Sequence, residues 1–241
     1  MDKSMNAVRL ADQVITLEDV DGQQQLLEAC GIALDGERLE CWSGPEDEAE
    51  ARQLLKQQWL SAHQPLVAIH PGGSQAWDTK RWSAERWAEV CDTLARHRIR
   101  AVLTGTAAER PLGAAILEEA RSKPILAMGK TSLGGLACLF RRCQAVITLD
   151  TAPLHVAAAV GTPVVALFGP TDPQRHAPPA EALTVLWKRP PCSPCYQRRC
   201  PLPGQKHLQC MTKISANEVV AAIESMLEHT TTTAHQEVET A

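Results

Sequence analysis

The sequence has no surplus of basic residues. Lys and Arg number 24 against 28 Asp and Glu, which gives a net charge of -4. Proteins that bind nucleic acid or an anionic membrane surface by electrostatic attraction carry a basic patch or stripe, and none is visible here. We therefore expect no nucleic acid among the partners.

Long apolar runs are missing as well. No segment approaches the roughly 20 apolar residues of a transmembrane helix, and residues 1–10 are polar where a signal peptide would be apolar. The simplest interpretation is a cytoplasmic protein. Its nine cysteines would then be mostly free thiols or metal ligands, because the cytoplasm keeps thiols reduced.

Several well-known motifs are absent. There is no G-x-G-x-x-G fingerprint and no serine nucleophile elbow. Gly129-Lys130-Thr131 is not the end of a P-loop, because Pro124 stands where that loop needs a glycine.

What is present from residue 65 onward is a strict alternation of strands and helices. Strands are predicted over residues 66–69, 101–104, 125–127, 145–149, 164–168 and 184–187, and helices over 83–95, 107–121, 132–140, 154–160 and 217–227. Continuous apolar strands that alternate with helices form a parallel sheet covered on both faces. We predict an α/β protein with a Rossmann-like, doubly wound parallel sheet.

The two ends of the chain lack this pattern. Residues 1–60 form a front segment with one clear, charged helix over 46–60, and residues 61–228 form the predicted Rossmann-like domain, with a Cys-rich loop at 190–212. Residues 229–241 are rich in Thr and Glu without an apolar period, so we predict a disordered tail.

Polar segments follow the predicted strands, where open parallel sheets bind ligands. The loop from His70 to Ser74 contains two glycines that let backbone N–H groups approach a ligand, and Lys80 could hold a phosphate as a point charge. A tight turn with a solvated lysine is the alternative. Glu109, after the strand at 101–104, is a weaker candidate.

A second polar segment, from Asp150 to His155, follows the strand at 145–149 and opens a helix. The Thr151 hydroxyl and the free N–H groups of the first helical turn would form an anion site, and Asp150 could accept ribose hydroxyls. The alternative is that Asp150 or Thr151 only caps the helix while His155 is a core residue.

The cysteines cluster near the end of the domain. Their spacing is compatible with a structural zinc site, and the alternatives are free thiols or a redox-labile pair. The candidate ligands are Cys192, Cys195, Cys200 and Cys210.

In this order the segments resemble glycosyltransferase family 9, the ADP-heptose:lipopolysaccharide heptosyltransferases. The resemblance covers residues 65–227 and rests on VAIHPGGSQAWDTKRWSAERWAEV, VLTGTAAE, TSLGGLACLFRRCQAVITLDTAPLHVAAAVGTPVVALFGPTDP and CSPCYQRRC followed by QCMTKIS. It implies a GT-B fold of two Rossmann-like domains. It also implies an inverting transfer of heptose from ADP-heptose to the lipopolysaccharide inner core, without a required metal or other cofactor.

The resemblance also implies residue roles. Lys80 corresponds to the lysine at the donor phosphates, and Asp150, Thr151 and His155 match the donor motif Asp-Ser/Thr-Gly-x-x-His, with Ala152 in place of its glycine. Other donor contacts are expected at Ser74, Glu109 and Thr131.

In this family the N-terminal domain binds the acceptor and supplies the general base. Residues 1–60 loosely resemble the end of that domain and the interdomain link, so we expect the base outside this chain. Contact with the membrane surface would come through the lipopolysaccharide acceptor. A non-catalytic nucleotide-sugar-binding module and a truncated, inactive remnant are the alternatives.

Overall fold

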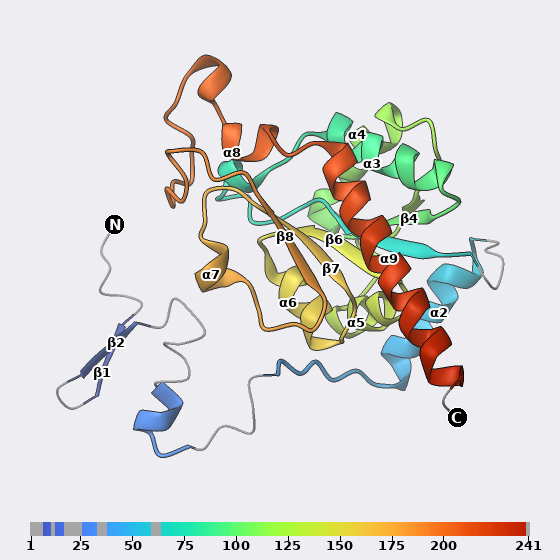
Figure 1. The fold of residues 1–241 in the computed structure, drawn as a ribbon, viewed down its shortest axis with the longest axis horizontal. Helices are drawn as coiled ribbons and strands as arrows, with labels where there is room; N and C mark the ends of the chain where they lie inside the picture. The colour runs from blue at the N-terminus through green and yellow to red at the C-terminus, as the bar shows by residue number, and fades with distance from the viewer. Residues whose placement is uncertain (1–6, 11–12, 17–25, 33–37, 59–63, 240–241) are drawn as a thin grey trace.

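A six-stranded, all-parallel sheet forms the centre of the computed structural model, which describes residues 7–10, 13–16, 26–32, 38–58 and 64–239 (Figure 1). The strand order is β5-β4-β3-β6-β7-β8, the Rossmann order 3-2-1-4-5-6. The strands are β3 (Leu66–His70), β4 (Arg100–Leu103), β5 (Ile125–Leu126), β6 (Ala145–Leu149), β7 (Val164–Phe168) and β8 (Leu183–Trp187). The predicted fold class and all the strands predicted from residue 66 on are confirmed.

Helices cover both faces of the sheet, because successive side chains of each strand point to opposite faces. Along β3, Val67 and Ile69 belong to one apolar layer and Ala68 to the other. The first layer is completed by α3 (Ala84–Arg96), α4 (Arg110–Glu119) and α9 (Ala216–Glu239), and the second by α2 (Pro45–Lys56), α5 (Leu133–Arg141) and α6 (Ala152–Ala159). Every residue of β3, β6 and β7 is buried, which explains why all but His70 and Thr148 among them are apolar.

Helix α2 is built into the second layer. Its Ala51 and Leu54 are buried, and its acidic side chains reach the start of α5. There the Ser132 hydroxyl lies 2.8 Å from Asp47 Oδ1 and 2.9 Å from Glu50 Oε2, and the Ser132 backbone N–H donates to Glu50 Oε2 at 2.9 Å. The domain division at residue 60 stays a prediction, but α2 packs on α5.

The C-terminal helix is longer than expected. We predicted a disordered tail over 229–241, and this is wrong for residues 229–239, because α9 continues to Glu239. Extending an existing helix costs far less than starting one, so the helix continues through the four threonines at 230–233 although threonine is a weak helix former. The absence of an apolar period therefore did not end the helix.

Short elements are the other difference. Strand β1 (Ala7–Leu10) was not expected from the sequence; it pairs antiparallel with β2 (Gln13–Thr16), which overlaps the short strand that residues 14–17 indicate. The single turns α7 (Pro173–His176) and α8 (Gln209–Thr212) and the 3-10 turns η2 (Asp78–Lys80) and η4 (Gly204–Lys206) were not expected either. The helix predicted over 107–121 is divided into a 3-10 turn η3 (Ala107–Glu109) and α4. Elements of three or four residues are too short to show a period.

Across the described ranges, no helix combines the length and the apolar character that a membrane crossing requires.

Candidate functional site

The loops that follow β3, β4, β5 and β6 surround one cavity of about 640 Å³. It lies where the strand order reverses, between β3 and β6, which is where doubly wound sheets bind ligands. Its polar lining comes from all four loops and includes His70, Ser74, Lys80, Thr106, Glu109, Thr131, Asp150 and Thr151.

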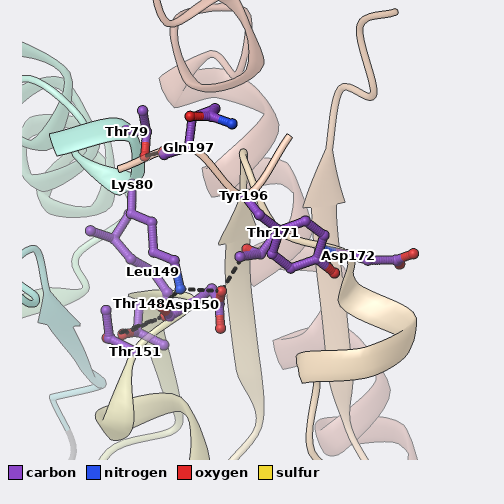
Figure 2. A network of polar contacts seen from close by, with 10 residues as sticks. All are labelled: Thr79, Lys80, Thr148, Leu149, Asp150, Thr151, Thr171, Asp172, Tyr196 and Gln197. Atoms are coloured by element: carbon purple, nitrogen blue, oxygen red, sulfur yellow. Dashed lines mark hydrogen bonds and ion pairs between the residues drawn. The ribbon is translucent and has the colours of Figure 1, made fainter. Parts of the chain in front are cut away.

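One wall of the cavity contains an ion pair between Lys80 and Asp150, and Thr171 binds the same carboxylate (Figure 2). The Lys80 ammonium lies 2.5 Å from Asp150 Oδ2 and donates to the Asp150 backbone oxygen at 3.0 Å. The Thr171 hydroxyl donates to the same Oδ2 at 2.6 Å, and the Trp77 ring centre is 4.8 Å from the ammonium. A lysine has three N–H donors, so this arrangement leaves one for a ligand.

The turn that carries Lys80 is itself held in place. Thr79 in η2 is buried, and its hydroxyl donates to the backbone oxygen of Gln197 at 2.6 Å (Figure 2). Gln197 belongs to the Cys-rich loop, so this loop fixes the backbone next to Lys80.

The start of α6 lies beside the glycine loop. Thr151 is the N-cap residue of α6, but its hydroxyl makes no capping hydrogen bond. A Cβ on Gly73 would lie only 2.7 Å from Thr151 Cγ2. Glycine is therefore needed for the loop after β3 to approach the positive end of α6 this closely.

His70 and Glu109 form another part of the cavity lining. Nδ1 of His70 is 3.1 Å from the Thr104 hydroxyl, and Nε2 is 4.0 Å from Glu109 Oε2. Burial lowers the pKa of His70 to about 4, although the charge of Glu109 acts in the other direction. The imidazole is therefore neutral at physiological pH.

The structure brings most of the predicted donor residues together. Ser74, Lys80, Glu109, Thr131, Asp150 and Thr151 line the cavity, and their role in donor binding stays a prediction. His155 is not among the lining residues. It is half-buried beside Asp150 and His176, and burial lowers its pKa.

Sequence reasoning missed His70, Trp77 and Thr171 as individual site residues. His70 belongs to the loop from His70 to Ser74 that follows a predicted strand, so its position was the available signal. Nothing in the local sequence indicated that the Thr171 side chain turns toward Asp150.

The Cys-rich loop at 190–212 encloses a separate, small cavity of about 90 Å³, lined by Cys192, Cys195, Cys200 and Cys210. We call this segment the four-cysteine loop. All four are free thiols. Burial raises the pKa of the Cys210 thiol to about 11, and the neighbouring Cys195 and Cys192 thiols contribute to this increase. Within the residues that the structure describes, no group of three or more His, Cys, Asp or Glu side chains is arranged to hold a metal ion. Zinc at this loop stays a prediction.

Comparison with known proteins gives a consistent result over most of the chain. Residues 9–206 match the family model of glycosyltransferase family 9 (heptosyltransferase). Lipooligosaccharide heptosyltransferase 2 of Haemophilus influenzae is 33% identical over 147 residues, which are 59% of this chain and 42% of that protein. The chain therefore spans less than half the length of this curated relative.

Solved structures agree. A family 9 glycosyl transferase from Veillonella parvula superposes with a TM-score of 0.74 at 27% identity, over 92% of this chain and 62% of that one. An Escherichia coli heptosyltransferase solved with ADP superposes with a TM-score of 0.56 over 85% of this chain and 55% of that one. At 22% identity the latter similarity concerns the fold alone.

Proposed function

This chain belongs to glycosyltransferase family 9, and on that premise we propose that residues 61–228 form the donor-binding half of a heptosyltransferase. The donor is ADP-heptose, and the heptose is transferred to the inner core of lipopolysaccharide. The observation that supports this most strongly is the cavity of about 640 Å³ at the reversal point of the sheet, with a lysine and a helix start on its wall.

The donor diphosphate lies between Lys80 and the start of α6 in this proposal. The N-terminus of a helix carries partial positive charge and free N–H groups, and Lys80 adds a full charge. Asp150 and Thr171 hold the ammonium in one orientation, so that its position is set before the ligand arrives. Such preorganised charge is most effective where negative charge develops in a reaction.

The proposed reaction forms a bond between an acceptor hydroxyl oxygen and the anomeric carbon of the heptose. The bond from that carbon to the diphosphate breaks, ADP leaves with the electron pair, and the configuration inverts. Lys80 and the α6 N-terminus stabilise the leaving diphosphate, so we expect no metal requirement. A general base must take the hydroxyl proton, and we assign the base and the acceptor site to sequence outside residues 61–228.

The comparisons support a nucleotide as the ligand, since an Escherichia coli heptosyltransferase with this fold was solved with ADP. The cavity volume of about 640 Å³ also lies within the range of small-molecule and cofactor sites.

Calorimetry with ADP and ADP-heptose tests the site. Lys80→Gln removes a charged donor from the phosphates, and we expect binding about 10- to 100-fold weaker, because hydrogen bonds to charged groups contribute about 1.5–3 kcal/mol. Lys123→Gln removes the same charge from an exposed position that does not line the cavity and should bind like the wild type. Equal affinity in the two variants would refute the phosphate assignment.

A transfer assay separates this proposal from its alternatives. Radiolabelled ADP-heptose and heptose-deficient lipopolysaccharide are incubated with the chain, with and without a relative's N-terminal domain. Transfer that requires the added N-terminal domain supports the proposal, whereas transfer by the chain alone would refute the expectation that the general base lies outside it. Donor binding without transfer in either mixture would indicate a non-catalytic module, and absence of donor binding by the folded chain would indicate an inactive remnant.

A further inference from the structure

We propose that Asp47 and Glu50 of α2 are positioning residues of the donor site, and that they act through Ser132 on the loop between β5 and α5. This inference rests on the proposed function and extends the donor site to a helix outside residues 61–228. Asp47 and Glu50 are not among the residues that line the cavity, so their effect on a ligand is carried by the residues that do.

The loop between β5 and α5 forms one edge of the cavity. Thr131, Ser132 and Leu133 all line it, and Leu133 is 65% exposed although it is apolar. Ligand sites are lined mainly by apolar side chains with a few polar groups that fix orientation, and this edge supplies both kinds. The position of the loop therefore sets the shape of the cavity on this side.

The first half of the loop is held from within the domain. Arg110, at the start of α4, donates to the backbone oxygens of Met128 and Gly129, both at 3.2 Å. The Gly129 N–H donates to the backbone oxygen of Gly105 at 2.7 Å. These bonds fix the chain just after β5, and the second half of the loop is fixed at Ser132.

Every hydrogen-bonding group of Ser132 is engaged. Its backbone N–H donates to Glu50 Oε2 at 2.9 Å, and its hydroxyl oxygen lies 2.8 Å from Asp47 Oδ1 and 2.9 Å from Glu50 Oε2. The same oxygen accepts from the Gly135 N–H at 2.8 Å, and the Ser132 carbonyl accepts from the Leu136 N–H at 2.9 Å. The one hydroxyl proton must therefore go to a carboxylate of α2, as the N–H does.

The sequence of α5 leaves space for both carboxylates. A Cβ on Gly134 would lie 2.4 Å from the Asp47 carboxylate, and a Cβ on Gly135 would lie 1.8 Å from Glu50 Oε2. Glycine is unfavourable inside a helix, and here two consecutive glycines stand in the first turn. The close approach of α2 to this loop explains why they are needed.

A second contact between the same helices provides a matched control. Glu48 lies in α2 between Asp47 and Glu50 and pairs with Arg142 at 2.5 Å. Arg142 is the C-cap residue of α5, at the opposite end of that helix from Ser132. Loss of the Glu48 carboxylate therefore removes one charge and one contact between α2 and α5, but leaves the contacts of Ser132 in place.

Calorimetry with ADP on the whole chain tests the inference. Glu50→Ala should bind ADP about threefold to tenfold more weakly than wild type, the usual range for residues that act without touching the ligand. Glu48→Ala should bind ADP like wild type. Both variants lose one negative charge, which alone would favour an anionic ligand, so weaker binding has the opposite sign to a charge effect. Glu50→Gln keeps an acceptor for the Ser132 N–H and should recover most of the loss.

A double-mutant cycle tests the route through Ser132. Ser132→Ala leaves α2 unchanged and should also weaken ADP binding. In Glu50→Ala/Ser132→Ala the loss should be clearly smaller than the product of the two single losses, because both substitutions remove the same contact between hydroxyl and carboxylate. Glu48→Ala/Ser132→Ala should bind ADP like Ser132→Ala alone.

The outcomes separate the inference from the proposed function. Thermal melts of each variant confirm folding, which we expect because alanine favours helix. If folded Glu50→Ala and Glu48→Ala bind ADP equally, or if the losses of Glu50→Ala and Ser132→Ala multiply in the double variant, the inference is overturned while the proposed function stands. If folded wild type binds no ADP, the proposed function fails and the inference fails with it.

Discussion

Acidification should destabilise this protein through His70. The pKa of His70 is lowered by burial from its ordinary 6.5 to about 4 in the folded state. As the pH falls below 6.5, the unfolded chain takes up a proton that the folded chain does not, and this favours unfolding. The loss of stability begins near pH 6.5 and is complete below about pH 4, where both states are protonated.

The size of the effect follows from the two pKa values. Between pH 7 and pH 5, proton linkage at one site with these values lowers the free energy of unfolding by about 2 kcal/mol. For a domain of this size, that corresponds to a melting temperature about 4–8 °C lower. The neighbouring Glu109 raises the pKa of His70, but burial outweighs it.

Calorimetric melts of wild type and His70→Asn at pH 7 and pH 5 measure this effect. The variant has no titrating group at this position, so wild type should lose about 2 kcal/mol more than the variant between the two pH values. The other histidines, including the half-buried His155, are common to both proteins and cancel in the difference. His97→Asn should behave like wild type. An equal loss in wild type and His70→Asn would refute the buried, neutral state of His70.

Three further predictions concern other parts of the structure. Gly72→Ala should weaken ADP binding about tenfold or more, because the new Cβ would displace the Glu109 side chain. Gly44→Ala is the control, since its Cβ would meet nothing closer than 3.9 Å. Unchanged affinity in both variants would contradict a contact between Glu109 and ADP. Ser215→Ala removes the capping box in which Ser215 and Glu218 bind each other's backbone N–H groups. Urea unfolding should show a loss of about 1 kcal/mol, and an unchanged midpoint would argue against the cap. If the four-cysteine loop binds zinc, purified protein should contain about one metal ion per chain and melt at a lower temperature after chelation, whereas metal-free protein of unchanged stability would exclude it.

The central strands were predictable because their environment is uniform. β6 and β7 have the predicted bounds, 145–149 and 164–168, since every residue in them is buried and nearly all of them are apolar. Because the carboxyl ends of parallel strands meet at one edge, the sequence also predicted that Lys80, Glu109 and Asp150 would lie near one another.

Side-chain direction was not predictable in the same way. His155 follows Asp150 closely in sequence but does not line the cavity, because its direction depends on how α6 is rotated against the sheet. The bond from Thr79 to Gln197 joins residues 118 positions apart, and the bond from Thr171 to Asp150 depends on the path of the loop after β7. Such contacts depend on tertiary packing, which leaves no local period in the sequence.

The docking of α2 has a mechanical consequence. Two-domain enzymes that close around their substrates bend at a few residues between the moving bodies. Asp47 and Glu50 hold α2 at the start of α5, and Ala51 and Leu54 are buried in one of the two apolar layers of the sheet, so α2 moves together with the six-stranded sheet. Arg141, the last residue of α5, also donates to the Ser43 hydroxyl at 2.8 Å and to the Cys41 backbone oxygen at 3.3 Å. A domain that preceded this helix would therefore have to bend before Cys41, and the segment from Cys41 to α2 would stay with the sheet during closure.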